Sequence, residues 1–494
     1  MSVVRSWVDR HQTLASVLVL AVPNLVMWAI LFPGYLQADH QVLIGRIAEG
    51  ELNQHHSLVW GLFAFPFLYL TPSFGVYGLV QILLFVAAAL YSARKLVRLG
   101  VLRSTFPLCA FMGLFPTYLL YNELYCSDLC FAYVLMVLTV SLVELVVTRG
   151  DALGGWGFCL RVVVLVVIAF NLRKNAVLIP LFLLVAVPLA YRQKALRSIA
   201  VFGVALVVSV CVDSFFPLVL HAKRSASSEM IGIPAFQIAY VYSAGGDIPA
   251  EANAELTKTR TAEEWAEAYI PYSSDFAKMD MALTPEFVRS WLAVGVRNPQ
   301  AYLYAYVQLI SPFWTLGYED MDWQNQGFVD IDFGNYDDFT TTNFTKLRDG
   351  YVGQFGTWES AARNVPKDLY ANIVRWRVPV LSDVCRLVLF DRGPPLWLLV
   401  AGFVITRRGS RGAYFLVSIP MFAIVFSLLI AAVMPMFRYV VPVYFALPYL
   451  GAFFWHLRGH GGRLEGGEDD GRQIGGREEH GGRRGDLAHA RHFA

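Results

Sequence analysis

The 494 residues of this chain are 56% hydrophobic and only 16% charged, a balance that favours an integral membrane protein over a soluble domain. The net charge of +2 gives no indication of nucleic-acid binding. Long apolar runs separated by short polar segments therefore predict an all-α polytopic membrane protein.

About ten apolar segments are predicted to be transmembrane helices. They cover residues 13–33, 75–93, 104–121, 129–148, 159–172, 175–191, 198–217, 394–406, 412–433 and 439–456. The first run ends at Phe32-Pro33-Gly34 rather than at a small-residue cleavage site, so we interpret it as a membrane anchor. Residues 57–72 are also apolar, but their two prolines favour a juxtamembrane or re-entrant helix over a full span.

Basic residues predict the orientation of these helices. Arg5 and Arg10 precede the first helix, and further arginines and lysines cluster in the connections at 94–103, 192–197 and 407–411. The positive-inside rule places these connections in the cytoplasm, together with both termini of a multi-pass plasma-membrane protein. The segments expected outside are then 34–56, 122–128, 171–175 and 218–393.

This orientation divides the chain into four parts. Residues 1–217 form an N-terminal transmembrane module, whose outer loops are 34–74, 122–128 and 171–175. Residues 218–393 form an extracytoplasmic segment, with helical stretches near 250–270 and 284–312. Residues 394–457 supply the C-terminal transmembrane helices. The tail at 458–494 is rich in Gly, Arg, Glu and His without apolar periodicity, which predicts a disordered cytoplasmic segment.

Polar clusters interrupt the apolar chain on the predicted outer side. Charged groups near hydrocarbon are costly, so they are usually retained for function. Asp39 begins a short helical stretch, and could cap that helix or act as a general base toward a hydroxyl group. Asp128, beside Glu123 in the second outer loop, allows a capping role or a second acidic position in the same site.

Basic groups lie on the same predicted side. Arg173 and Lys174 could extend to lipid headgroups, but positive charge is disfavoured there, which favours a clamp on a phosphate or diphosphate. Arg438 and Tyr439 open the last helix and form a second candidate phosphate-binding pair, or a structural anchor.

Two adjacent histidines, His55 and His56, precede the segment 57–72. One of them could bind a phosphate or position an acceptor, or both could form an interfacial polar turn. Adjacent side chains point in different directions on a helix, so a shared metal ion is not expected.

The order and sidedness of these residues resemble the GT-C superfamily of membrane glycosyltransferases. This superfamily includes protein O-mannosyltransferases and the bacterial aminoarabinose transferase of lipid A. An acidic first outer loop, a histidine-containing segment, an acidic second loop, a basic third loop and a terminal Phe-Arg-Tyr-x-x-Pro sequence follow one another. The outer segments Glu229 to Gln237 and Asn298 to Tyr302 are similar to a poorly characterised bacterial branch of it.

The resemblance implies roles for individual residues. Asp39 matches the first-loop acid at the catalytic centre of the family, and Asp128 matches the acidic residue of the second loop. Lys174 matches the basic residue between later helices, and Arg438-Tyr439 match the pair before the final helix.

The sequence departs from the family pattern in two places. His56 matches a histidine that opens the juxtamembrane helix, but Ser57 stands where the family usually has proline. No second acid follows Asp39 directly, where the O-mannosyltransferases carry Glu.

A protein of this type would move a sugar from a polyprenyl-phosphate carrier to an extracytoplasmic acceptor, such as a cell-envelope glycan, lipid or protein. Asp39 would deprotonate the acceptor hydroxyl, while Arg173, Lys174 and Arg438 would hold the carrier's phosphate. Asp128 and His56 would shape the pocket. The resemblance implies no cofactor, and no residue pattern indicates a divalent metal.

Two other functions fit the composition. A lipid or polysaccharide transporter would need polar residues along its helices and internal repeats. The helix interiors read as nearly free of charge apart from Glu144, and no repeat is evident, which favours an enzyme acting at one face. A non-catalytic membrane scaffold would need neither Asp39 nor Lys174.

Overall fold

The computed structural model describes residues 11–32, 34–54, 56–71, 75–223, 231–279, 281–316, 388–389, 391–431 and 434–460. The predictions on His55, on residues 317–387 of the extracytoplasmic segment and on the tail beyond residue 460 therefore lie outside the described residues.

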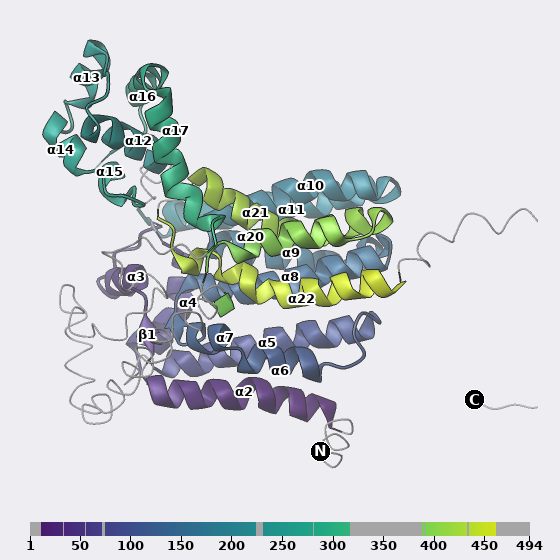
Figure 1. Cartoon of the computed structure of the whole chain (residues 1–494). Helices are drawn as coiled ribbons and strands as arrows, with labels where there is room; N and C mark the ends of the chain where they lie inside the picture. Colours follow the sequence, from purple (N-terminus) through teal and green to yellow (C-terminus); the bar gives the residue numbers. More distant parts are fainter. Residues whose placement is uncertain are drawn as a thin grey trace, which may run out of the picture.

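The apolar helices run side by side in one bundle (Figure 1). They are α2 (Gln12–Leu31), α5 (Val76–Arg98), α6 (Phe106–Leu114), α7 (Pro116–Tyr121), α8 (Ser127–Val147), α9 (Trp156–Leu172), α10 (Leu178–Ala190), α11 (Ala195–Val219), α20 (Pro394–Ile405), α21 (Arg411–Ala431) and α22 (Val441–His460). Every apolar segment predicted to span is helical over most of its length. The segment 104–121 breaks into α6 and α7 at Phe115, because a residue before proline disfavours the helical region.

Within the described ranges, five helices are long and apolar enough to cross a membrane. They are Gln12–Ile30, Val76–Arg98, Ser127–Val147, Arg192–Val219 and Arg408–Ala431. Shorter apolar helices lie among them at Leu58–Tyr69, Trp156–Leu172, Lys174–Ala190 and Pro394–Ile405. The chain is therefore a mostly helical protein whose long apolar helices are compatible with a membrane.

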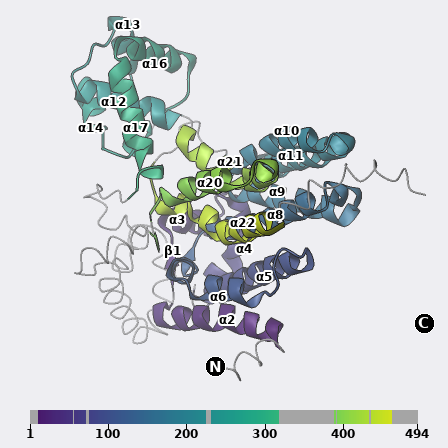
Figure 2. The same ribbon diagram turned by 45° about the vertical axis from the view of Figure 1, so that its right-hand side comes forward.

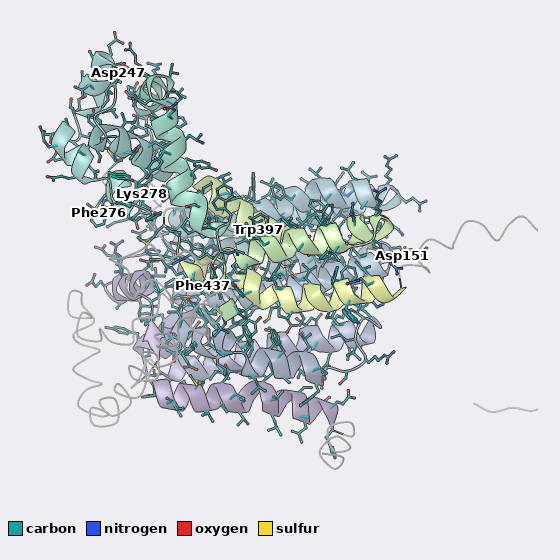
Figure 3. The ribbon with its side chains drawn as sticks, in the orientation of Figure 1. Asp151, Asp247, Phe276, Lys278, Trp397 and Phe437 are labelled. Carbon is teal, nitrogen blue, oxygen red and sulfur yellow. The ribbon has the colours of Figure 1, made fainter. Side chains whose placement is uncertain are left out.

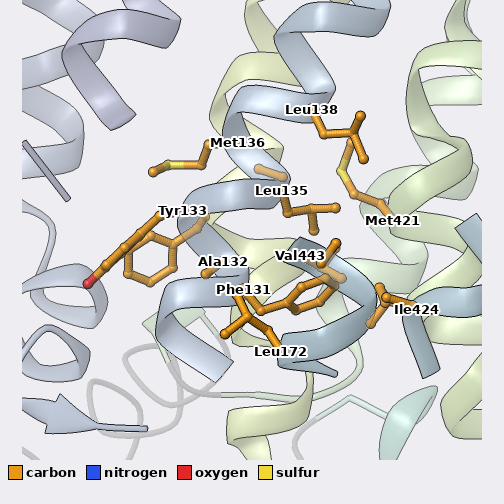
Figure 4. Packing of buried hydrophobic residues seen from close by; sticks show 14 of the residues in the cluster. Phe131, Ala132, Tyr133, Leu135, Met136, Leu138, Leu172, Met421, Ile424 and Val443 are labelled. Atoms are coloured by element: carbon orange, nitrogen blue, oxygen red, sulfur yellow. The ribbon is translucent and has the colours of Figure 1, made fainter. Parts of the chain in front are cut away.

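The core of the bundle surrounds α8. This helix is the most buried of the long apolar helices, and it packs against α5, α9, α21 and α22. Phe131 and Leu135 of α8 lie against Ile424 and Val443 from the C-terminal helices (Figure 4). By contrast, α2 and α11 expose leucine and valine side chains, as helices that contact lipid do.

The two ends of the bundle differ. The connections after α5, α8, α10 and α20 lie together at one end, which Asp151 marks in Figure 3. We call it the basic end, because its arginines and lysines include those at 94–103, 192–197 and 407–411. The opposite end, which we call the α3 end, holds the helices α3 (Ala38–Ala48) and α4 (Leu58–Tyr69).

Short elements complete both ends. The 3-10 turns η2 (Lys174–Val177) and η9 (Phe437–Tyr439) belong to the α3 end, and η1 (Asp151–Gly154), η3 (Arg192–Lys194) and η8 (Arg408–Ser410) belong to the basic end. At 12 residues, α4 is shorter than the ~20 residues that a perpendicular span requires.

Two very short strands tie the first and second loops of the α3 end together. Strand β1 (Tyr35–Leu36) pairs in parallel with β2 (Leu124–Tyr125), a small exception to the all-α prediction. Gly34, immediately before β1, has φ +86°, and a Cβ at this position would lie 2.2 Å from the Tyr125 hydroxyl oxygen. Glycine is therefore required both for the backbone conformation and for this close approach.

A separate group of helices projects from the α3 end (Figures 1 and 2). It comprises α12 (Gly232–Ser243), α13 (Ala250–Leu256), α14 (Ala262–Glu267), α15 (Asp275–Lys278), α16 (Pro285–Arg297), α17 (Pro299–Ile310) and η5 (Ser311–Phe313). Its own core includes Ile238, Trp265 and Phe287. The predicted helical stretches near 250–270 and 284–312 are confirmed.

Candidate functional site

An ion pair joins the first loop to the 3-10 turn that precedes the last helix, at the α3 end. Asp39 lies in the first turn of α3, and Arg438 lies in η9, 399 positions later. Nη2 of Arg438 donates to Oδ2 of Asp39 over 2.8 Å. The Arg438 side chain is 6% exposed and that of Asp39 is 39% exposed, so the carboxylate remains accessible while its partner is buried.

Asp39 is not the residue that caps α3. The N-cap is Gln37, whose side-chain oxygen accepts from the backbone N–H of His40 over 3.3 Å. Nε2 of Gln37 also donates to Oδ2 of Asp39 over 3.1 Å. The Asp39 carboxylate is therefore held by two donors and is free of a capping role.

The charge on Asp39 depends on Arg438. Burial is the largest influence and favours the neutral carboxylic acid, but the positive charge of Arg438, helped by His56, outweighs it. The pKa of Asp39 therefore lies well below its usual range, and the residue is a carboxylate at neutral pH.

A second acid–base pair lies next to the first. Asp128 occupies the first turn of α8, with Cys126 as the N-cap, so it is also not the capping residue. Arg173, between α9 and η2, forms an ion pair with Asp128, and both side chains are largely buried. A negative charge in the first turn also interacts favourably with the helix dipole.

Tyr439 connects the two pairs. The Cζ atom of Arg173 lies 4.6 Å from the centre of the Tyr439 ring, and the Cζ atom of Arg438 lies 5.1 Å from it. Two guanidinium groups thus contact one aromatic ring, an arrangement that cation–π attraction stabilises. We call these five residues the charged cluster: Asp39, Asp128, Arg173, Arg438 and Tyr439.

His40 fixes the position of α3 against α8. Its Nδ1 lies 2.7 Å from Oε1 of Gln37, which accepts, and its Nε2 accepts from the backbone N–H of Ser127 over 3.0 Å. The ring thereby satisfies an otherwise orphaned donor in the first turn of α8. Burial lowers the pKa of His40 to about 3, so the imidazole is neutral at physiological pH. His56 lies beside it, with 6.1 Å between the ring centres.

Lys174 points to a different partner. It forms an ion pair with Asp213 of α11, and Nε2 of Gln54 donates to the Asp213 backbone oxygen over 2.6 Å. The basic pair predicted as one clamp is therefore divided: Arg173 belongs to the charged cluster, and Lys174 belongs to a neighbouring, more exposed ion pair.

Two ionisable residues within the helices were not predicted, Asp213 at this end and Arg161 at the basic end. Asp213 lies inside an apolar helix, as does Arg161 of α9, so the reading of nearly charge-free helix interiors was wrong. Ionisable residues within apolar helices usually indicate a functional site, and this pattern in the sequence could have identified both residues.

Glu123 is the other unpredicted feature of the α3 end. It is fully buried, and neither carboxyl oxygen has a hydrogen-bond partner among the described residues. Burial raises the pKa of Glu123 well above its usual range, so it is a neutral carboxylic acid within the second loop.

Searches of known protein families, of curated proteins and of solved structures return no match to this chain. Among the described residues, no three His, Cys, Asp or Glu side chains gather in a way that could hold a metal ion. The chemistry of the α3 end is therefore interpreted from the charged cluster itself.

Proposed function

We propose that this chain is a membrane glycosyltransferase of the GT-C type. The observation that carries the proposal is the ion pair between Asp39 and Arg438, which leaves an accessible carboxylate beside a buried guanidinium group. Glycosyl transfer from a phosphate carrier needs a base for the acceptor and a cation for the leaving phosphate. One residue pair at one end of an apolar bundle supplies both.

In the proposed reaction, the acceptor hydroxyl oxygen attacks the anomeric carbon of a sugar linked to polyprenyl phosphate. The new bond joins the acceptor oxygen to the sugar, and the bond between the sugar and the phosphate oxygen breaks. The hydroxyl proton passes to the Asp39 carboxylate. The bonding electrons leave with the polyprenyl phosphate, whose added charge Arg438 and Arg173 stabilise.

Carrier binding would also strengthen Asp39 as a base. In the free protein, Arg438 holds the pKa of Asp39 low, and a carboxylate with a low pKa accepts protons poorly. A phosphate bound to Arg438 would share its positive charge and contribute a negative charge nearby. Both effects raise the pKa of Asp39. The base would thus be activated only when the donor is present.

The remaining residues of the site have supporting roles in this proposal. Asp128 orients Arg173, and Tyr439 spaces the two guanidinium groups. His56, whose charge helps to lower the pKa of Asp39, and Lys174 would contact the carrier or the acceptor. About ten membrane crossings, with the basic end in the cytoplasm, would place the charged cluster at the outer membrane surface.

The test is a transfer assay with the purified full-length chain in proteoliposomes. Synthetic polyprenyl-phosphate-linked hexoses and pentoses are supplied one at a time with envelope glycan, lipid or protein acceptors, and released polyprenyl phosphate is measured. Release above the level of empty liposomes, for at least one donor, supports the proposal. Movement of a labelled carrier across the bilayer without release from any donor would instead identify a transporter.

A further inference from the structure

A pocket of about 440 Å³ lies at the basic end, away from the charged cluster. It is lined on one face of α5 by Ala87, Leu90 and Tyr91 and by cationic residues, with Arg161 of α9 opposite. The positions 87, 91, 94 and 98 on α5 recur with helical spacing, so they share one face of that helix. Helix α8 packs against both α5 and α9.

Four of the residues that line the pocket are cationic: Arg94, Lys95, Arg98 and Arg161. Glu144 of α8 pairs with both Lys95, over 2.5 Å, and Arg161. Among the described residues it is the only acidic group that forms an ion pair with these cations. The pocket therefore retains an excess of positive charge.

Glu144 and its neighbours also hold the pocket in shape. Nε of Arg161 donates to Oγ of Ser141 over 3.2 Å, one helical turn from Glu144. Nη2 of Arg94 donates to the hydroxyl of Thr13 on α2 over 2.9 Å. Arg94, Lys95 and Arg161 are thus positioned by partners on α2 and α8 before any ligand binds, which lowers the entropic cost of binding.

The inner part of the pocket is apolar. Ala87 and Leu90 line this part, and Leu83, one turn from Ala87 toward the N-terminus of α5, is 67% exposed. A ligand that fits must combine a negatively charged head with an apolar chain along α5. Free phosphate would use the cations but would gain nothing from this apolar surface.

We propose that this pocket binds the phosphate headgroup of an anionic phospholipid, with its acyl chains along α5. Basic pockets between apolar helices at the cytoplasmic side of a membrane are suited to such headgroups. The proposal concerns the end of the bundle opposite the charged cluster, so it does not depend on the glycosyltransferase function.

The test measures binding to the purified full-length chain in a zwitterionic detergent by native mass spectrometry. The chain is titrated with phosphatidylglycerol, phosphatidylcholine or inorganic phosphate. The double variant Arg94→Gln/Arg98→Gln should bind phosphatidylglycerol about 10-fold or more weakly than the wild type, because it removes two cations near the headgroup. The matched control is Arg407→Gln/Arg408→Gln, which removes two exposed cations from the same end outside the pocket.

A third variant separates shape from charge. Ala87→Leu keeps every charge and fills the apolar part of the pocket, so it should also weaken phosphatidylglycerol binding. Because Ala87 is exposed, this variant should fold normally. Equal phosphatidylglycerol binding by all variants, or equal losses in the control, would overturn the proposal. Competition by inorganic phosphate with no effect of Ala87→Leu would assign the pocket to free phosphate instead.

Discussion

Arg438 and Asp39 lie 399 positions apart in the sequence and form an ion pair of 2.8 Å. Through this contact the turn that precedes the last long helix meets the first loop. Tyr439 then links the pair to Arg173 and Asp128, so four separate segments of the chain build one charged cluster. Its stability depends on how tightly the loops that carry these residues are held.

The first prediction concerns the loop that carries Asp39. Gly34→Ala should lower the free energy of unfolding by a few kcal/mol, because it adds a clash with Tyr125 to the cost of a left-handed backbone. Gly50→Ala is the matched control. Gly50 also has a positive φ, of +78°, but a Cβ there meets no atom within 4 Å, so its cost should be only about 1 kcal/mol. Denaturant titration in mixed micelles measures both values, and equal losses would contradict the close packing of the two loops.

The second prediction concerns pH. The unfolded chain protonates histidine near pH 6.5, whereas folded His40 is protonated only near pH 3. Between these values the unfolded state binds the additional proton, so stability falls as the pH is lowered from about 6.5 to about 3, by up to about 1.4 kcal/mol per pH unit. Asp39 adds a separate loss of stability at lower pH. Its pKa is depressed in the folded state, so its contribution is fully present above the usual aspartate range and is lost as the pH falls below that range.

Replacing the histidine tests this assignment. His40→Asn should flatten the decline between pH 6.5 and pH 3, even though the variant is less stable at pH 7. The control is His221→Asn, at an exposed position after α11, which should keep the slope of the wild type. The same slope in His40→Asn and in the wild type would show that His40 is not the group responsible.

Much of the architecture follows from the sequence. Apolar runs of sufficient length predict helices at the right places. A run that is buried or faces lipid has no water to bond its backbone, so it must make all its backbone hydrogen bonds internally. The α3 end is less predictable. The contact of Asp39 with Arg438 has no local signal, because no pattern within one segment specifies a partner 399 positions away.

Local backbone geometry explains the other differences. Arg173 is extended, with φ −150° and ψ 115°, whereas Lys174 begins a 3-10 turn. Adjacent side chains across such a change point in different directions, so the basic pair divides between Asp128 and Asp213. Gln37 caps α3 in place of Asp39 because the extended backbone that a cap requires falls two residues earlier.

The third prediction follows from the separate partners of Arg173 and Lys174. Lys174→Ala should weaken the binding of a fluorescent polyprenyl phosphate about 10-fold, because it removes a cation from the approach to the charged cluster. Asp213→Asn should leave binding unchanged or tighten it, because it frees the same cation.

Equilibrium titration in micelles measures both affinities. Lys223→Ala is the control, since Lys223 forms an exposed ion pair with Glu51 at the same end. If Lys174→Ala binds the carrier as the wild type does, Lys174 has no part in the phosphate site.

The fourth prediction concerns sidedness. Cysteines introduced at Glu51 and Lys223, whose side chains are 57% and 70% exposed, should react with a membrane-impermeant maleimide in intact cells. Cysteines at Arg98 and Arg408, at the basic end, should react only after permeabilisation. The native cysteines are replaced first, and each variant is checked for normal insertion. Labelling at Arg98 in intact cells would reverse the proposed orientation.

The most direct test of the proposed function is Asp39→Asn in the transfer assay. The amide keeps the size of the side chain but cannot accept the acceptor's proton, so turnover should fall by about 10²-fold or more, with carrier binding largely unchanged. The control, Asp247→Asn, removes a carboxylate from an exposed ion pair with Arg297 and should transfer sugar normally. Transfer by Asp39→Asn at the wild-type rate would contradict the assignment of Asp39 as the general base, and with it the central claim.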